Sequence, residues 1–210
     1  MAAFDDIVSN EGELRAIMGT PKSRSVLKEQ RTLDAHTRAF IARSPFLLLA
    51  TAGADGTCDV SPKGDAPGFV LVLDDTRLVI PDRPGNKRLD GMLNLLVNPH
   101  VGIIFLVPGR DETLRVNGHA CVTRDPQLLA RMAVEGRTPQ VGIGVEVEQC
   151  FVHCPKAFRR SDLWAPERWP ALDTLPSMAR VLYDQIRPAG VSLEDWEREV
   201  AAGNTRACLY

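Results

Sequence analysis

A short basic segment near the middle of the chain has the residue types that bind a phosphate group. The sequence Pro-Asp-Arg-Pro-Gly-Asn-Lys-Arg follows an apolar run and brings Arg83, Lys87 and Arg88 close together. We expect a helix to begin at Asn86, because asparagine is a favoured N-cap and the first N–H groups of a helix lack partners within it. Such N–H groups beside cationic side chains form a phosphate site. An ordinary helix cap beside solvated cations is the alternative interpretation.

The composition of the chain sets the broad class of the protein. At 210 residues, with 44% hydrophobic and 25% charged residues, it is long enough for one domain with a buried core. The formal net charge of -2 lacks the basic excess of proteins that neutralise nucleic-acid phosphates. No apolar run reaches the roughly 18 residues that span a bilayer, and the N-terminal sequence lacks the pattern of a signal peptide. We therefore predict a cytoplasmic protein with residues 1–210 in a single domain, and neither nucleic acid nor a membrane as its partner.

The cysteines predict neither a disulfide framework nor a metal site. There are five, an odd number, and no Cys-x-x-Cys pair occurs. Cys150 and Cys154 flank His153 in a segment that alternates like a strand. Successive side chains of a strand point to opposite faces, so His153 is expected to point away from both cysteines. The other histidines, His100 and His119 among them, lack ligand-like spacing, so no metal is predicted.

The elements expected around the basic segment are mainly strands. A helix is predicted over residues 23–43, which place apolar side chains among charges without glycine or proline. Strands are expected at residues 46–51, 58–61, 69–73, 77–80, 101–107, 112–123 and 141–154, with one brief helix at 127–133. This order favours a mainly β (α+β) fold built on an antiparallel barrel over a parallel doubly wound sheet. Residues 1–44 are expected to form an N-terminal helical extension and residues 155–210 a helical C-terminal region.

The sequence carries no motif of a self-contained catalytic site. Gly142-Ile-Gly144 is not followed by the third glycine of a dinucleotide-binding turn. Phosphate-loop, His-Glu-x-x-His and Gly-x-Ser-x-Gly sequences do not occur either. Any chemistry is therefore expected to depend on a bound cofactor.

Four segments follow one another in a distinctive order. They are Val60-Ser-Pro-Lys-Gly-Asp65, Ile80-Pro-Asp-Arg-Pro-Gly-Asn-Lys-Arg-Leu-Asp90, Asn98-Pro and Glu112-Thr-Leu-Arg-Val-Asn-Gly118. This combination resembles the pyridoxamine 5'-phosphate oxidase-like flavoproteins, and within them an uncharacterised bacterial group of FMN-dependent members. The resemblance implies an antiparallel split β-barrel with flanking helices, which binds FMN at the interface of a homodimer.

The resemblance places the FMN phosphate on the basic segment. The family's phosphate-binding turn falls on Arg83, Asn86 and Lys87, with Asp82 beside them. The oxidase itself has a Ser-Arg-Lys sequence there, but asparagine and lysine also supply hydrogen-bond donors.

The strand that lies along the flavin in the family corresponds to Ser61, Pro62, Lys63 and Gly64. On this strand a hydroxyl or a backbone N–H would meet flavin N5. The Lys63 ammonium would stabilise the negative charge that a reduced flavin develops. A surface lysine in a turn is the alternative for Lys63.

A late segment of the family reaches the flavin of the partner subunit. It resembles the sequence from Cys154 to Trp164 here, so Lys156, Arg160 and Trp164 are candidates to close the site. The alternative is that Trp164 lies in the core and the basic side chains are solvated.

The resemblance implies an FMN-dependent oxidoreductase that acts on a small molecule by hydride transfer at flavin N5. The substrate is left open, because the oxidase's C-terminal Arg-x-His-x-Arg pattern does not occur in the chain. A non-catalytic protein of the same fold that carries flavin, haem or a deazaflavin is one alternative. A structural dimer whose basic turn binds only stray anions is another.

Overall fold

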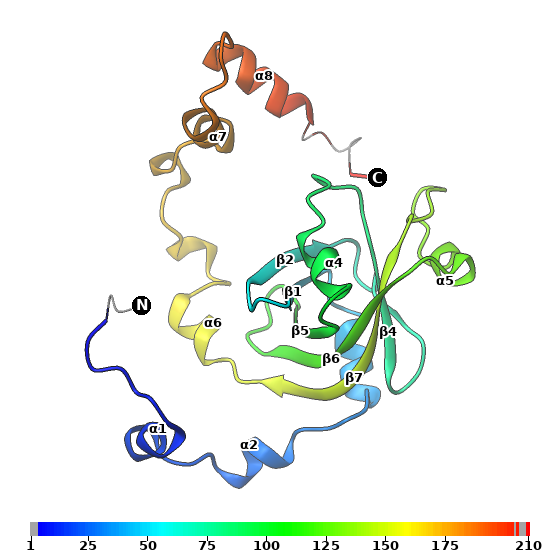
Figure 1. Cartoon of the computed structure of the whole chain (residues 1–210), viewed down its shortest axis with the longest axis vertical. Helices are drawn as coiled ribbons and strands as arrows, with labels where there is room; N and C mark the ends of the chain where they lie inside the picture. The colour runs from blue at the N-terminus through cyan, green and yellow to red at the C-terminus, as the bar shows by residue number, and fades with distance from the viewer. Residues whose placement is uncertain (1–3, 204, 206–208) are drawn as a thin grey trace.

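A seven-stranded antiparallel sheet lies at the centre of the computed structural model (Figure 1), which describes residues 4–203, 205 and 209–210. Its strands are β1 (Phe46–Ala52), β2 (Cys58–Gly64), β3 (Leu71–Val72), β4 (Arg77–Pro81), β5 (His100–Leu106), β6 (Thr113–Thr123) and β7 (Gly142–His153). They are arranged in the order β2-β1-β5-β6-β7-β4-β3. Because β2 and β3 are edges, the sheet is not closed, and the prediction of an antiparallel split barrel with flanking helices is confirmed.

Alternation of side chains along the strands creates the core. In β1, Leu47 and Leu49 are buried, whereas Phe46 and Leu48, which alternate with them, are partly exposed. The same period of two recurs in β5, where Ile103 and Phe105 are fully buried. These inward side chains form one hydrophobic cluster. The opposite face of β1 and β5 therefore carries a second, exposed row of side chains.

Eight α-helices of the described chain surround or extend from the sheet. They are α1 (Glu11–Met18), α2 (Ser23–Leu27), α3 (Ala35–Ile41), α4 (Asp90–Leu95), α5 (Pro126–Ala130), α6 (Lys156–Ser161), α7 (Met178–Ile186) and α8 (Leu193–Gly203). Short 3-10 turns occur at Pro166–Arg168 and Leu172–Thr174. None of the helices in the described residues is long and apolar enough to span a membrane.

The prediction of one helix over residues 23–43 is wrong, because the segment forms two short helices, α2 and α3. Between them Gln30 pairs with β7, exchanging backbone hydrogen bonds of 3.0 and 2.7 Å with Cys150. Asp34 then begins α3 as an N-cap whose side chain accepts a 2.8 Å hydrogen bond from the N–H of Thr37. Backbone pairing with the sheet therefore interrupts a segment that has the composition of a helix.

The other differences from the predicted elements are small. The strand expected at residues 69–73 is reduced to Leu71–Val72, and the helix expected at 127–133 is Pro126–Ala130. Asp125 begins that helix by accepting hydrogen bonds from the N–H groups of Gln127 and Leu128. The remaining strands agree with the prediction to within three residues at either end.

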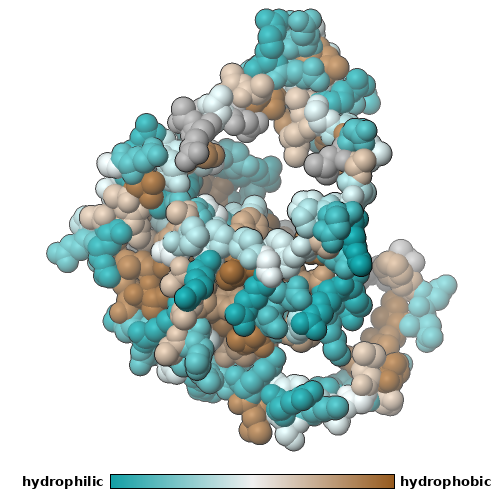
Figure 2. Space-filling model, turned by 180° about the vertical axis from the view of Figure 1, so that it is seen from behind, coloured by the Kyte–Doolittle hydropathy of each residue, from teal (hydrophilic) through white to brown (hydrophobic). Residues whose placement is uncertain are grey.

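Both ends of the chain extend away from the sheet. Figure 1 shows α1 and α2 on one side and α7 and α8 beyond the other, and Figure 2 shows gaps between these extensions and the body of the molecule. Helices α1, α2 and α8 contain no buried residue. Several apolar side chains on the extensions are exposed, namely Leu14, Ile17, Met18, Val26, Leu27, Met178 and Ile186. The helical extensions therefore contribute little to the core of this chain.

Candidate functional site

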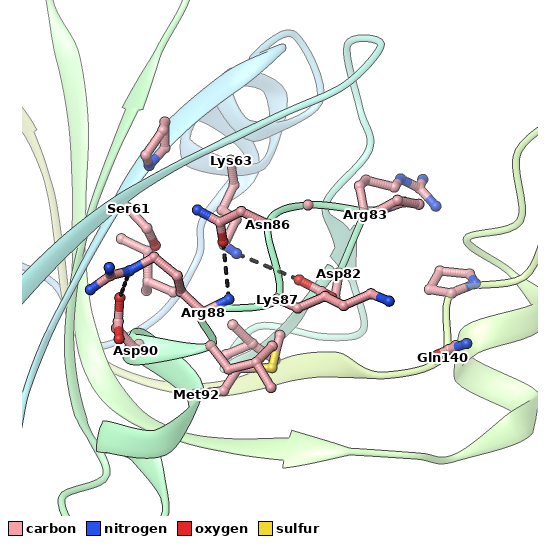
Figure 3. A pocket seen from close by; sticks show the side chains of 18 of the residues that line it. Ser61, Lys63, Asp82, Arg83, Asn86, Lys87, Arg88, Asp90, Met92 and Gln140 are labelled. Atoms are coloured by element: carbon pink, nitrogen blue, oxygen red, sulfur yellow. Dashed lines mark hydrogen bonds and ion pairs between the residues drawn. The ribbon is translucent and has the colours of Figure 1, made fainter. Parts of the chain in front are cut away.

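A cavity of about 780 Å³ lies between β2, the loop that follows β4, and α4. Figure 3 shows its side chains converging from these elements and from the segment around Gln140. Its volume is in the range of pockets that hold a cofactor or drug-sized ligand. It is lined by Leu49, Asp59, Val60, Ser61, Pro62, Lys63, residues 82–92, residues 137–140, Ile143 and Tyr210.

The basic loop does not begin a helix at Asn86, so that prediction is wrong. Helix α4 begins at Asp90, and Asn86 instead closes a tight turn by accepting a 3.0 Å hydrogen bond from the N–H of Arg88. Lys87 and Leu89 both adopt the left-handed region, with φ of 60° and 62°. Such backbone costs about 1 to 3 kcal/mol per residue, and it clusters at ligand-binding sites.

Positive charge exceeds negative charge around the cavity. Five lining side chains are cations, namely Lys63, Arg83, Lys87, Arg88 and Arg137, and three are carboxylates, namely Asp59, Asp82 and Asp90. Lys63 lies 3.5 Å from Asp82, and Arg88 lies 2.7 Å from Asp90. Among ion pairs between described residues, none includes Lys87 or Arg137. In a chain whose net charge is -2, this local excess favours an anionic ligand.

Arg83 binds to parts of the chain outside the basic loop, at Asp65 and Met132. Its Nε lies 2.6 Å from Asp65 Oδ2, and its Nη1 donates a 3.0 Å hydrogen bond to the carbonyl of Met132. Figure 3 shows its guanidinium directed away from Ser61 and Lys63. Tyr210 completes the group: its hydroxyl donates a 2.6 Å hydrogen bond to Asp65, and its ring lies 5.7 Å from the guanidinium carbon of Arg83. Arg83 thus anchors the loop, although sequence analysis assigns it to the phosphate.

Side chains of strand β2 alternate in burial beside the cavity. Ser61 and Lys63 are half-buried, whereas Val60, Pro62 and Gly64 are exposed. Residues 61–63 line the cavity, but Gly64 does not. A Cβ at Gly64 would lie 3.3 Å from the carbonyl of Pro45 and from the ring of Phe46, so packing against the start of β1 accounts for this glycine.

Helix α4 closes the cavity from the side of the sheet. Asn94 Nδ2 donates a 3.0 Å hydrogen bond to the hydroxyl of Thr51 on β1. A Cβ at Gly91 would lie 3.4 Å from Asp59 and 3.5 Å from Thr51, which is ordinary van der Waals contact. The hydrogen bond holds the helix close to β1, and the backbone of the basic loop is held with it.

The three late candidates lie outside this cavity. None of Lys156, Arg160 and Trp164 lines it. Trp164 Nε1 donates a 2.9 Å hydrogen bond to the carbonyl of Arg110, and the ring stacks on Phe158 with centroids 5.7 Å apart. Trp164 is therefore held on its own chain. Contact with the flavin site of a partner subunit stays a prediction for all three.

Sequence analysis missed residues that approach the cavity from distant parts of the chain. Residues 137–140 precede β7 and lie beside the basic loop because Asp82 N–H donates a 3.1 Å hydrogen bond to the carbonyl of Val141. Tyr210, which is far from the basic loop in the sequence, also lines the cavity. No local pattern marks either contribution, since both depend on how strand β4 pairs with β7 and on where the last described residues lie.

A comparison with protein-family models matches residues 33–154 to the pyridoxamine 5'-phosphate oxidase model. This range covers more than half of the chain and includes β1, β2, the basic loop and β7. The chain belongs to the pyridoxamine 5'-phosphate oxidase family. The family resemblance inferred from the four sequence segments is thereby confirmed. No curated protein matches the chain.

Several solved structures are similar to part of this family member. HupZ from Group A Streptococcus is 17% identical, with 58% of this chain and 99% of that chain covered and a TM-score of 0.48. A putative pyridoxamine 5'-phosphate oxidase from Lactobacillus delbrueckii is 22% identical, with 58% and 95% covered and a TM-score of 0.46. HutZ, the heme storage protein from Vibrio cholerae, is 18% identical, with 58% and 93% covered and a TM-score of 0.42. At these values no ligand of theirs is assigned to this chain.

Proposed function

We propose that the cavity binds FMN and that the protein is an FMN-dependent oxidoreductase acting on a small molecule. The observation that carries the proposal is the excess of cations around a cavity of cofactor size, formed by β2 and the basic loop within the residues that match the family model. An FMN phosphate carries negative charge, and its ring system needs a flat space beside a strand. The volume of about 780 Å³ and the charge of the lining residues fit both parts of the molecule.

The basic loop would hold the phosphate. Lys87 has no carboxylate partner among the described residues, so its ammonium is available to an anion. The side-chain oxygen of Asn86 is used by Arg88 N–H, which leaves the Asn86 amide N–H groups as donors. The left-handed backbone at Lys87 and Leu89 is the kind of conformation that turns consecutive N–H groups toward an anion. Arg83 supports the loop through Asp65, and Asp82 holds Lys63.

Strand β2 would lie along the flavin ring. A bound FMN supplies the atom N5 that accepts or donates a hydride during oxidation and reduction of a substrate. Ser61 supplies a hydroxyl on the cavity side of the strand, and Lys63 supplies a cation 3.5 Å from Asp82. Lys63 would favour the reduced cofactor by compensating its negative charge. Backbone N–H groups of the same edge strand are available to orient the ring.

We also propose that two copies form a homodimer with the flavin site at their interface. Support comes from the outward face of the sheet, where Phe46, Val60 and Ile104 on three neighbouring strands are 37%, 60% and 41% exposed. The exposed apolar side chains of the helical extensions would gain a partner in the same way. In this arrangement residues 1–210 form one FMN-binding domain, and Lys156, Arg160 and Trp164 would approach the partner's site.

The test begins with an absorption spectrum of the purified protein and mass identification of any ligand released by heat. Flavin absorption with FMN released supports the proposal. A haem or deazaflavin spectrum would replace FMN by another ligand of the fold, and a colourless protein that takes up no added FMN would overturn the proposal.

The phosphate assignment is tested by Lys87→Ala, with Lys22→Ala as the control because Lys22 lies on the N-terminal extension away from the cavity. We expect Lys87→Ala to weaken FMN binding by about 1.5 to 3 kcal/mol, the range for a hydrogen bond to a charged group, and to leave the melting temperature of the ligand-free protein unchanged. Fluorescence titration of FMN measures the difference. Equal FMN affinity in the two variants would rule out Lys87 as a phosphate ligand.

A further inference from the structure

Two histidines that are distant in sequence meet on the surface of the sheet. His100 begins β5, and His119 lies directly opposite it on β6. Their ring centroids are 4.4 Å apart, and their Nε2 atoms are 3.0 Å apart. Neither residue lines the FMN cavity proposed above. The pair therefore requires an explanation of its own.

Nδ1 of each ring lies beside an oxygen atom. His100 Nδ1 lies 2.9 Å from Asn98 Oδ1, and His119 Nδ1 lies 3.3 Å from Glu148 Oε1. Because the Asn98 oxygen only accepts, Nδ1 of His100 carries the hydrogen, and Nε2 of a neutral His100 is a lone pair. The 3.0 Å contact between the two Nε2 atoms is then a hydrogen bond that His119 donates. A metal ion can take the place of this hydrogen when the proton of His119 moves to Nδ1, beside the Glu148 carboxylate.

A β-bulge between β6 and β7 brings Glu148 close to this pair. On β6 and β7, Asn117 pairs with Gln149 but the next residue, Gly118, pairs with Val147, so Glu148 is the extra residue of a β-bulge. Bulges redirect a side chain out of the regular alternation. Gly118 makes the bulge possible, since a Cβ there would lie 1.9 Å from the carbonyl oxygen of Glu146.

Asn98, just before β5, makes two hydrogen bonds to His100. Its side-chain oxygen accepts both the ring N–H of His100 and a 3.2 Å hydrogen bond from the backbone N–H of the same residue. Metal-binding histidines commonly donate their second ring N–H to a carboxylate or an amide-type oxygen, which fixes the tautomer and aims the other nitrogen. Asn98 does this for His100, and the Glu148 carboxylate lies 3.3 Å from Nδ1 of His119.

We infer that His100 and His119 form a binding site for a divalent transition-metal ion of the kind that imidazole favours, such as Zn²⁺, Ni²⁺ or Cu²⁺. With metal–nitrogen bonds of about 2.0 to 2.1 Å, two adjacent ligands lie about 2.9 Å apart at a right angle and about 3.4 Å apart at a tetrahedral angle. The observed 3.0 Å falls between these values. Opposite axial ligands of a haem iron would need about 4 Å, so the pair fits adjacent ligation and not a haem sandwich.

The site would be an open one. The described residues contain no cluster of three or more metal-ligating side chains, so the protein supplies two nitrogens and the other positions go to water or an added ligand. His119 is 42% exposed and Glu148 51%, which gives solvent direct access. The inference departs from the expectation of no metal, because strand pairing brings together histidines whose sequence spacing suggests nothing.

Calorimetric titration of the full chain with ZnCl₂, after removal of metal with a chelator, tests the site. We expect saturable binding that is lost in His100→Ala and in His119→Ala but kept in His36→Ala, a control that removes another exposed imidazole. Glu148→Gln keeps both ligands but removes the carboxylate charge 3.3 Å from Nδ1 of His119, and should lower the affinity by about 10- to 100-fold. Circular dichroism checks that each variant is folded.

Two results would overturn the inference. One is the absence of saturable Zn²⁺ binding in the wild-type chain. The other is binding that persists in both single-histidine variants, which would place Zn²⁺ elsewhere. Cu²⁺ as a second probe adds a spectroscopic readout: nitrogen couplings from two imidazoles are expected in the wild type, and their absence would contradict the site.

Discussion

Asp65 joins the basic loop to Tyr210, which lies far along the sequence. Its side chain is only 2% exposed, and it accepts hydrogen bonds from Arg83 and from the Tyr210 hydroxyl. Burial alone would raise the pKa of this carboxyl group, but the hydrogen bonds from Tyr210, the N–H of Ala66 and Arg83 outweigh burial and lower the pKa below its ordinary value of 3.8. The ionised form is therefore the one that holds the loop.

We expect Asp65→Asn to lower the free energy of unfolding at pH 7 by about 3 kcal/mol, because the largely buried Arg83 would lose its carboxylate. In Asp111→Asn, the control, the lost partner is the exposed Arg159, and a change of about 0 to 1 kcal/mol is expected.

The stabilisation by Asp65 also depends on pH, because its pKa is lower in the native state than in the unfolded state. The stabilisation is complete at a pH above the unfolded-state pKa and is lost as the pH falls through the native-state pKa. Urea denaturation at pH 7 and in acid measures both effects. A gap between wild type and Asp65→Asn that stays constant in acid would contradict this account.

The residue types of a segment predict the role of a side chain only where that side chain contacts residues close to it in the sequence. Ser61, Lys63, Asn86 and Lys87 are identified from sequence, and all four line one cavity. The partner that redirects Arg83, by contrast, lies 18 residues earlier in the chain. Pairing of His100 with His119 is likewise invisible until β5 and β6 are placed in register.

Strands are easier to predict here than helices, because alternation of buried and exposed side chains is a local pattern. All seven strands occur near their expected positions, whereas the two wrong helix predictions, at Asn86 and over residues 23–43, depend on competing contacts. Asn86 accepts a hydrogen bond from Arg88 N–H within a turn, which is a role that asparagine fills as readily as a helix cap. At residues 28–34, pairing of Gln30 with β7 ends α2 early.

The bulge between β6 and β7 gives an element-scale prediction. Gly118→Ala should destabilise the fold by about 1 to 3 kcal/mol or more. The added Cβ would lie 1.9 Å from the backbone oxygen of Glu146, so β6 and β7 would have to separate. Gly102→Ala on the neighbouring strand β5 is the matched control. There the nearest atom, Asn117 Oδ1, is 3.5 Å from the added carbon, an ordinary contact. Midpoints of chemical denaturation compare the two, and equal midpoints would show that the bulge tolerates a side chain.

At the scale of the whole molecule, much of the exposed apolar surface lies on the sheet and on the helical extensions. Neither region is covered by the described part of this chain, and the extensions bury almost nothing against its core. Extended helices with exposed apolar residues are costly in water unless a second surface covers them. A second copy of the chain offers such a surface, since it presents the same sheet face and the same extensions in a symmetric arrangement.

Ile104→Lys tests this arrangement directly. Ile104 lies opposite Leu48 on β1 and is 41% exposed, so a lysine there can stay solvated in a monomer but would be buried in a dimer formed through this face. We expect the dimer to weaken by about tenfold or more, while the melting temperature of the monomer changes little. Ile104→Val keeps the surface apolar and should remain dimeric. Sedimentation at several concentrations separates the two variants, and a dimer unaffected by the lysine would place the interface away from β1 and β5. If the dimer weakens and FMN affinity falls with it, the flavin site depends on both copies; if FMN affinity is unchanged, one chain is sufficient to hold the cofactor.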